Sequence, residues 1–235
     1  MNENFFGDER DFRKYLLLKT LLENNRSKKF LVAWYLTEEE SNEKKNRWSY
    51  LDSSAYINLD AELSSWLKDC VKKNDTSKIN CIENKFLYFS YNITFYTEPV
   101  PKWKKERERW FNQLKDKAQE SGVVFLDPDT GINFDSKRNS IKHVYINEIV
   151  ELWESGKSLI VFNYFPRINH EIFVYGTMMA FLVRIPDAIV KSIYEDKVAY
   201  FFILQRNDGK IFENLKKGIE NMSNRVFKIA EINLC

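Results

Sequence analysis

Two aspartates separated by a proline follow a short apolar run near the middle of the chain. The run VVFL at 123–126 is typical of a buried strand, and Asp127, Pro128, Asp129 and Gly131 belong to the turn that ends it. Ligands of open α/β sheets bind in the crevice beyond the carboxyl ends of the strands, so this turn is placed for chemistry. The two carboxylates could hold a cation. The alternative is a plain turn, because Asp-Pro and a following glycine are ordinary turn residues.

A second polar segment follows the next apolar run, SLIVFN at 158–163, which also predicts a buried strand. Asn163, Tyr164 and Phe165 end this strand, and Arg167 comes two residues later. The guanidinium of Arg167 could pair bidentately with a phosphate or a carboxylate, and Tyr164 or Phe165 could stack on a base. The alternative is a strand-end turn whose aromatic residues belong to the core. In a doubly wound sheet this segment should lie beside Asp127.

Three further charged residues could complete the same edge of the sheet. Arg13 and Lys14 lie on a predicted first helix over 11–24, and Glu38 follows a predicted first strand over 29–36. Glu38 could join the two aspartates of the turn as an oxygen ligand of Mg²⁺. The alternative for Arg13 and Lys14 is a pair of solvated cations on a helix surface.

Composition predicts a soluble cytoplasmic protein with no membrane segment. The formal net charge is only +2, from 36 basic and 34 acidic residues, so a nucleic-acid partner would need a local basic face. Cys70, Cys81 and Cys235 show no close pairing, and without a signal peptide they indicate reduced thiols. His143 and His170 are too isolated to form a zinc site.

The helix predicted over 102–120 interleaves basic and aromatic residues. Trp103, Trp110 and Phe111 fall on one face of it, which favours a place in the core over a platform for bases. Its charges alternate in sign and are typical of a solvated outer face. A nucleic-acid surface on this helix is the alternative.

Predicted strands and helices alternate along almost the whole sequence. The pattern predicts one α/β domain over 1–235, a Rossmann-like three-layer sandwich with a mostly parallel seven-stranded sheet. The polar segment 37–58 is expected to be a loop or lid after the first strand. The other expected strands are 79–82, 93–96, one ending at 127, 158–163, 199–205 and 225–232. The other expected helices are 59–73, 102–120, a short one ending near 156, 171–183, 186–195 and 208–222.

Three segments together resemble known protein families. An aspartate followed by a proline at the end of the fourth major strand is similar to the Asp-Pro-Pro-aromatic tetrad of class I S-adenosylmethionine-dependent methyltransferases that methylate amines. The segment DFRKYLLL at 11–18 is similar to the Asp-x-x-Lys-His-Leu-x-Leu opening of bacterial 23S ribosomal RNA adenine-N6 methyltransferases. Taken with YFPR at 164–167, the pattern also resembles a family of uncharacterised bacterial proteins that carry Phe-Leu-Asp-Pro-Asp-x-Gly.

The resemblance implies a sheet of the methyltransferase type, S-adenosylmethionine as cofactor and a nucleobase amine in nucleic acid as substrate. The residues that would act on the substrate are Asp127, Pro128, Asp129 and Arg167. The residues that would contact the cofactor are Arg13, Lys14, Glu38 and Gly131. The residues that would bind the base are Asn163, Tyr164 and Phe165.

The chain also departs from the methyltransferase pattern, which keeps two alternatives open. The family places a glycine-rich turn after the first strand, but no glycine occurs between Gly7 and Gly122. Asp129 and Thr130 stand in place of the second proline and the aromatic residue. One alternative is a Mg²⁺-dependent hydrolase of nucleotides or nucleic acid with Asp127 and Asp129 as metal ligands. The other is a non-catalytic module on the same fold that binds nucleic acid or protein. No oligomeric state is predicted.

Overall fold

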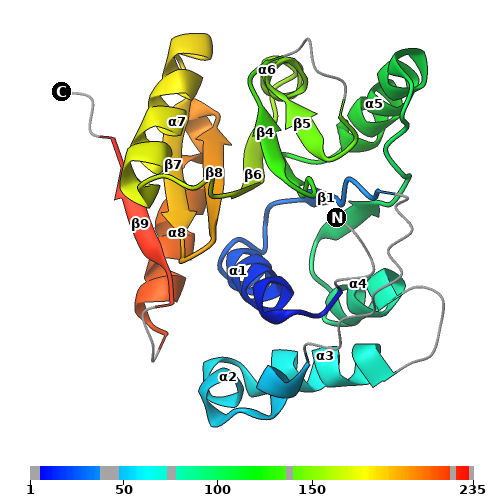
Figure 1. Ribbon diagram of the computed structural model, residues 1–235, viewed down its shortest axis with the longest axis vertical. Helices are drawn as coiled ribbons and strands as arrows, with labels where there is room; N and C mark the ends of the chain where they lie inside the picture. Colours follow the sequence, from blue (N-terminus) through cyan, green and yellow to red (C-terminus); the bar gives the residue numbers. More distant parts are fainter. Residues whose placement is uncertain (1–5, 38–47, 73–77, 136–139, 223–225, 233–235) are drawn as a thin grey trace.

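The computed structural model describes residues 6–37, 48–72, 78–135, 140–222 and 226–232. A seven-stranded sheet in the order β2-β1-β3-β6-β8-β7-β9 forms its centre (Figure 1). The strands of this sheet are β1 (Phe30–Ala33), β2 (Ile93–Tyr96), β3 (Val123–Leu126), β6 (Ser158–Tyr164), β7 (Ile189–Tyr194), β8 (Val198–Leu204) and β9 (Lys228–Glu231). β2, β1, β3 and β6 pair in parallel, β8 is antiparallel to both β6 and β7, and β9 is antiparallel to β7. Five strands therefore run in one direction, and the predicted mostly parallel α/β sheet is confirmed.

Helices cover both faces of the sheet. The helices are α1 (Glu9–Asn24), α2 (Ser54–Leu59), α3 (Ala61–Lys72), α4 (Lys78–Tyr88), α5 (Lys104–Ala118), α6 (Ile146–Glu154), α7 (His170–Arg184) and α8 (Gly209–Glu220). Buried residues of α1, α3, α4 and α8 share one core with the sheet, and those of α5, α6 and α7 share the other. This is the expected three-layer arrangement. Among the described helices, none is long and apolar enough to cross a membrane.

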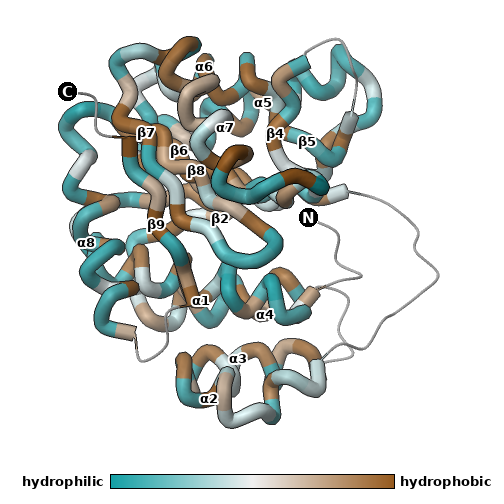
Figure 2. The backbone as a smooth tube through the Cα atoms, turned by 60° about the vertical axis from the view of Figure 1, so that its left-hand side comes forward, coloured by the Kyte–Doolittle hydropathy of each residue, from teal (hydrophilic) through white to brown (hydrophobic). Residues whose placement is uncertain are grey.

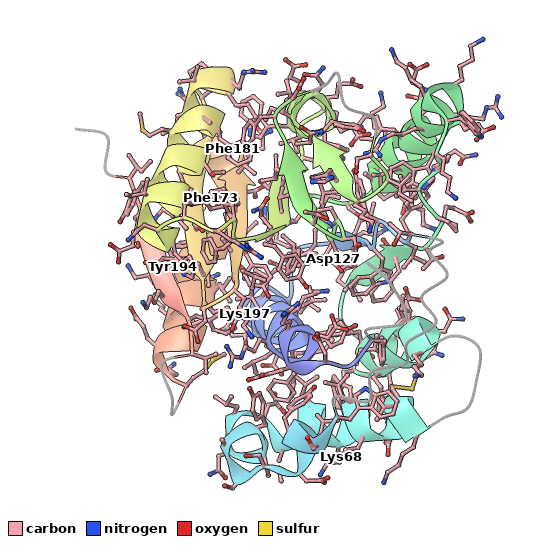
Figure 3. The ribbon with its side chains drawn as sticks, viewed as in Figure 1. Lys68, Asp127, Phe173, Phe181, Tyr194 and Lys197 are labelled. Atoms are coloured by element: carbon pink, nitrogen blue, oxygen red, sulfur yellow. A yellow bond between two sulfur atoms is a disulfide. The ribbon has the colours of Figure 1, made fainter. Side chains whose placement is uncertain are left out.

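The central strands form because their side chains are apolar on both faces. Every residue of β1, β3 and β8 is buried, and hydrophobic residues (brown) follow the inner strands in Figure 2. Successive residues point to opposite faces, so Phe30 and Leu31 of β1 belong to different cores. On the α7 side, Phe173 and Phe181 pack their rings at 6.2 and 5.9 Å from that of Phe201 in β8 (Figure 3).

Helix α1 is buried for most of its length and packs against α8 near the other end of the chain. Asp8 caps α1 by accepting hydrogen bonds from the first-turn backbone. Asn25, the residue after α1, accepts a hydrogen bond from Asn214 at 3.1 Å and donates one to the carbonyl of Ile211 at 3.3 Å. A β-carbon at Gly218 would lie 2.7 Å from the methyl group of Thr20, so the glycine permits close packing of the two helices.

A small two-stranded sheet is inserted between β3 and β6. Its strands are β4 (Gly131–Asn133) and β5 (His143–Tyr145), and they pair in parallel. The buried Arg107 of α5 holds this insertion, because its guanidinium donates to Glu148 at 2.7 and 2.9 Å and to the carbonyl of His143 at 2.7 Å. The insertion fixes the path of the chain after Asp127.

Two predicted elements are wrong. The weak strand expected at 79–82 lies inside α4, whose apolar residues Ile79, Ile82 and Phe86 recur at helical spacing on its buried side. The helix expected over 186–195 is the strand β7, in which Val190 and Ile193 are opposite Ile203 and Tyr200 of β8. Pairing with β8 outweighs the helix signal given by the proline at 186.

The segment expected to be a loop over 37–58 contains two short helices in its described residues. A 3₁₀ helix, η2 (Ser49–Asp52), and α2 occupy its second half, while residues 38–47, Glu38 included, lie outside the described residues. The hydroxyl of Tyr50 donates to the carbonyls of Gly7 and Asp8 at 2.8 and 2.9 Å. This segment therefore packs on the start of α1.

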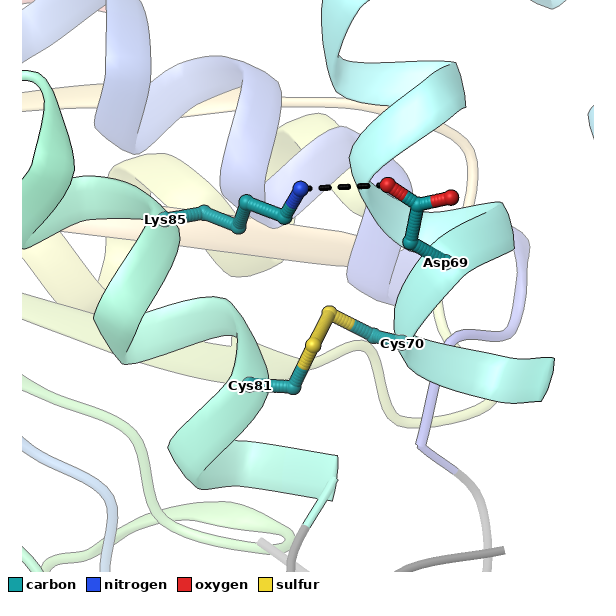
Figure 4. Close-up of a disulfide and its surroundings, with 4 residues drawn as sticks. All are labelled: Asp69, Cys70, Cys81 and Lys85. Atoms are coloured by element: carbon teal, nitrogen blue, oxygen red, sulfur yellow. Dashed lines mark hydrogen bonds and ion pairs between the residues drawn. A yellow bond between two sulfur atoms is a disulfide. The ribbon is translucent and has the colours of Figure 1, made fainter. Parts of the chain in front are cut away.

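The prediction of reduced thiols is wrong for two of the three cysteines. Cys70 of α3 and Cys81 of α4 form a disulfide with a Cα–Cα distance of 5.5 Å, and Lys85 and Asp69 pair at 3.1 Å between the same helices (Figure 4). Their separation of 11 positions did not reveal the pairing, because it depends on α3 and α4 packing side by side. Cys235 lies outside the described residues.

Candidate functional site

Three strands that run in the same direction end at one edge of the sheet, and each delivers a polar residue there. Asp127 follows β3, Tyr164 ends β6 and Glu195 follows β7. The backbone amide of Asp127 donates to the carbonyl of Ala33 at 2.9 Å, which continues the pairing of β1 and β3. Helix α1 lies against this edge (Figure 1). The structure therefore confirms that the ends of β3 and β6 are neighbours, as the sheet order requires.

The ammonium group of Lys14 in α1 forms a buried ion pair with the carboxylate of Asp127. Its Nζ is 2.8 Å from Oδ2 of Asp127 and 3.0 Å from Oδ1 of Asp11, and the three residues are only 4%, 1% and 7% exposed. Burial alone would lower the pKa of Lys14, but the negative charges of Asp11 and Asp127 outweigh burial and raise it. Burial raises the pKa of Asp127, and the ammonium of Lys14 offsets part of this shift. The result is a buried cation held between two carboxylates.

Tyrosine hydroxyls surround this buried pair. Tyr15 and Tyr200 are fully buried, and neither hydroxyl has a hydrogen-bond partner among the described residues. Burial and the nearby carboxylates raise the pKa of both phenols well above the ordinary value. The hydroxyl of Tyr164 accepts a hydrogen bond from Arg10 at 3.3 Å, and the guanidinium lies 5.2 Å from the centre of its ring. Neutral hydroxyls with unused hydrogen-bonding capacity are groups that a bound water or ligand would satisfy.

Glu195 is a site residue that the sequence did not reveal. It is 5% exposed and accepts a hydrogen bond from Arg13, whose guanidinium also contacts Glu9 at 2.9 Å and the hydroxyl of Tyr56 at 3.2 Å. Burial raises the pKa of Glu195, and Arg13 opposes the shift. An acidic residue directly after IVKSIY is the available signal, but the proline at 186 favours a helix over this run and so hides a strand end there.

A cavity of about 400 Å³ lies beside the ion pair of Arg13 and Glu195. It is bounded by the start of α1, by η2 and by the turn between β7 and β8. Figure 3 shows Lys197 of that turn beside α1, with Asp127 near the same helix. The lining residues are Asp8, Glu9, Arg10, Arg13, Ser49, Tyr50, Glu195, Asp196 and Lys197. This volume falls in the range of small-ligand sites, and eight of the nine side chains are polar or charged without an aromatic ring.

Other predicted site residues have structural contacts of their own. Asp129 is half-buried, and its charge raises the pKa of His143 in the β4–β5 insertion, which burial lowers overall. Asn163 accepts a hydrogen bond from the backbone amide of Ile132 at 2.7 Å. Phe165 stacks on the ring of His170 at 4.0 Å between centres.

Three more predicted positions can be placed. Pro128 and Gly131 are buried, and Gly131 has a φ of +138°, while Arg167 is exposed. In the part of the chain that the structure describes, no group of three or more His, Cys, Asp or Glu residues is arranged to hold a metal ion.

Fold and site together define an α/β protein with a Rossmann-like sheet and a buried charged cluster at the carboxyl edge of its strands. No protein family, curated protein or solved structure matches the chain.

Proposed function

We propose that this protein is a methyltransferase-like enzyme that recognises the amino group of a nucleobase at the tip of β3. The observation that carries the proposal is the contact of 2.8 Å between the Asp127 carboxylate and an ammonium group, that of Lys14. The carboxylate thus already holds a nitrogen donor in a buried setting, where such hydrogen bonds are strong. An exocyclic amine that displaced Lys14 would meet the same acceptor.

The order of the strands supports the proposal. β8 is antiparallel and lies between β6 and β7, which precede it in the chain. This inserted strand resembles the sheet of class I methyltransferases, as does the position of Asp127 after the strand next to β1. The buried cluster also contains several groups with shifted pKa values, which is frequent at functional sites.

The chain's own residues would do the following in such a reaction. Asp127 would accept a hydrogen bond from the amine and orient it. Asp11, which already contacts Lys14 at 3.0 Å, would retain the ammonium when it leaves Asp127. The raised pKa of Asp127 would also let it take up a proton released by the amine.

The described residues after β1 do not fit a glycine-rich cofactor turn. Trp34 and Tyr35 are fully buried, and their rings pack on Phe95 and Trp110 in the two cores. Tyr35 has a φ of +48°, a conformation that favours glycine, so the backbone bends where the family bends but carries a large side chain. This mismatch favours a second candidate, a non-catalytic module that binds a nucleobase amine at the same edge.

Calorimetric titration separates the two candidates. For the enzyme, we expect S-adenosylmethionine and S-adenosylhomocysteine to bind, and methyl transfer to an adenine-containing oligonucleotide to disappear in Asp127→Asn. The matched control is Asp116→Asn, at an exposed position of α5. If neither adenosyl compound produces heat with the wild-type protein, the enzyme proposal fails. Binding of the oligonucleotide alone, lost in Asp127→Asn, would then support the binding module.

A further inference from the structure

Helix α7 is apolar on the side that faces away from the sheet as well as on the side that packs against it. On the inner side, Val174, Met178 and Phe181 are fully buried. Five of the ten exposed large apolar residues in the described part of the chain lie on or just before the outer side, each 43% to 76% exposed. These residues, here called the α7 stripe, recur at helical spacing: Ile168, Ile172, Tyr175, Met179 and Val183. A contiguous exposed apolar patch marks an interaction surface.

The other two helices of the same layer, α5 and α6, are polar on their outer sides (Figure 1). Every exposed position of these two helices carries a polar or charged residue. In α7, by contrast, no charged residue lies between Glu171 and Arg184 at the two ends of the helix. A helix that is apolar all round is normally buried, and the described residues do not bury the outer side of α7. The stripe therefore suits a neutral, apolar partner.

A glycine near the middle of the stripe leaves room for a second helix. Gly176 is exposed, and a β-carbon built on it would have no neighbouring atom within 4 Å. Glycine inside a helix is destabilising relative to alanine, so this position has a cost without a benefit in the single chain. The backbone of another helix can approach more closely here than beside the large side chains of the stripe.

The order of residues along α7 is complementary to its own reverse. When two copies of α7 lie antiparallel with Ile172 of one opposite Val183 of the other, the same register places Met179 of one opposite Gly176 of the other. The longest unbranched side chain of the stripe thus meets the space at the glycine, twice in each pair of helices. A twofold axis produces this arrangement, because it presents the same surface of both copies to each other.

The exposed area of the stripe is large enough for a dimer. The five exposed fractions together equal about 2.9 whole residues. At roughly 200 Å² for a large side chain, each copy would contribute on the order of 600 Å². Two copies would bury on the order of 1,200 Å², the lower end of the range for specific stable interfaces.

We infer that the α7 stripe is the interface of a symmetric dimer, in which the α7 helices of two copies pack antiparallel with Met179 of one against Gly176 of the other. The inference goes beyond the proposed function and does not rest on it. It concerns α7, whereas α1 and its buried ion pair lie on the other face of the sheet.

Sedimentation velocity over a range of protein concentrations tests the inference. We expect the wild type to form a dimer in reversible equilibrium with the monomer. Met179→Lys places a charge in the interface and should raise the Kd of the dimer about a hundredfold, about tenfold for each of its two copies. The matched control is Leu87→Lys on α4, since Leu87 and Met179 are both 48% exposed, and it should dimerise as the wild type does.

A second variant tests the close approach at the glycine. Gly176→Leu remains apolar and has open space in the single chain, so it should fold, yet it fills the space that receives Met179 and should also raise the Kd. Circular dichroism and thermal unfolding show that each variant is folded before its Kd is measured.

Three results would overturn the inference. The first is a wild type that stays monomeric up to millimolar concentration. The second is a dimer whose Kd is the same in the wild type, in Met179→Lys and in Gly176→Leu, because its interface would then lie elsewhere. The third is a monomeric wild type that binds phosphatidylcholine vesicles, which would assign the stripe to a lipid surface.

Discussion

Lys14 combines a stabilising contact with a candidate role in the site. Its ammonium is the cationic partner of two buried carboxylates, and removal of one member of a buried ion pair leaves an uncompensated charge. We expect Lys14→Met to lower the free energy of unfolding by about 3–5 kcal/mol, measured by urea denaturation. Lys115→Met removes an exposed pair with Glu151 and should cost no more than about 1 kcal/mol. Equal costs for the two variants would show that the Lys14 pair is screened by water.

Glu195 contributes to the stability of the fold in a way that depends on pH, and its raised pKa fixes the direction of that dependence. Burial raises its pKa above 4.5, so the folded protein binds its proton more tightly than the unfolded chain does. The stability of the wild type relative to Glu195→Gln should therefore fall as the pH rises from 4.5 through the folded pKa. Denaturation curves of both proteins across this window measure the difference.

Glu231 provides a control of opposite sign for this experiment. Its hydrogen bonds with Lys191 and Lys216 lower its pKa. The stability of the wild type relative to Glu231→Gln should thus rise with pH as Glu231 ionises. If the difference in stability between the wild type and the variant changed with pH in the same direction for Glu195→Gln and Glu231→Gln, the expected effect of burial on Glu195 would be contradicted.

Gly131 is required both for its backbone conformation and for the space beside it. Its φ is +138°, and a β-carbon there would lie 2.1 Å from Oδ1 of Asn163. We expect Gly131→Ala to cost more than the roughly 1–3 kcal/mol of backbone strain alone, because Asn163 would also lose its bond to Ile132. Gly156→Ala is the matched control, since Gly156 has a φ of +84° but open space around it. Thermal denaturation compares the two.

At the scale of elements, the disulfide ties α3 to α4. A cross-link that closes a short loop restricts the unfolded chain and stabilises the fold by about 2–4 kcal/mol. We expect dithiothreitol to lower the midpoint of urea denaturation of the wild type. The double variant Cys70→Ser, Cys81→Ser should begin at the lower midpoint and show no response to the reductant. A wild type insensitive to the reductant would mean that the bond contributes nothing to stability.

Elements with a clear apolar period were predictable from the sequence, and those decided by distant partners were not. The leucine-rich pattern of α1 and the short apolar runs of β1 and β3 gave the correct type of element, although β1 ends three residues before the end of the strand expected over 29–36. The proline at 186 favours a helix over the segment that forms β7, and only the pairing of this segment with β8 makes it a strand. The run at 79–82 was too short to show the period of α4.

At the scale of the molecule, the edge of the sheet that carries the site was predictable, and so was the presence of Lys14 there, but the direct contact between Lys14 and Asp127 was not. Strand order brought Asp127 beside Asn163 and Tyr164, as expected. Nothing in the spacing of residues indicated that α1 would place Lys14 on Asp127, over a separation of 113 positions. Burial of this pair depends on packing contacts across the whole chain, and sequence periodicity does not encode these.

The packing of α1 on α8 has a consequence for the order of folding. Asn25 bonds to residues 186 and 189 positions further along the chain, so these contacts close a very long loop. Local pairs such as the β7–β8 hairpin can form early, whereas α1 must wait for a partner that is synthesised much later than α1 itself. Until α8 has formed, the apolar side of α1 and the carboxylate of Asp127 lack their final cover. A nascent chain therefore passes through a period in which the edge that becomes the most buried part of the site is open to solvent and to other molecules.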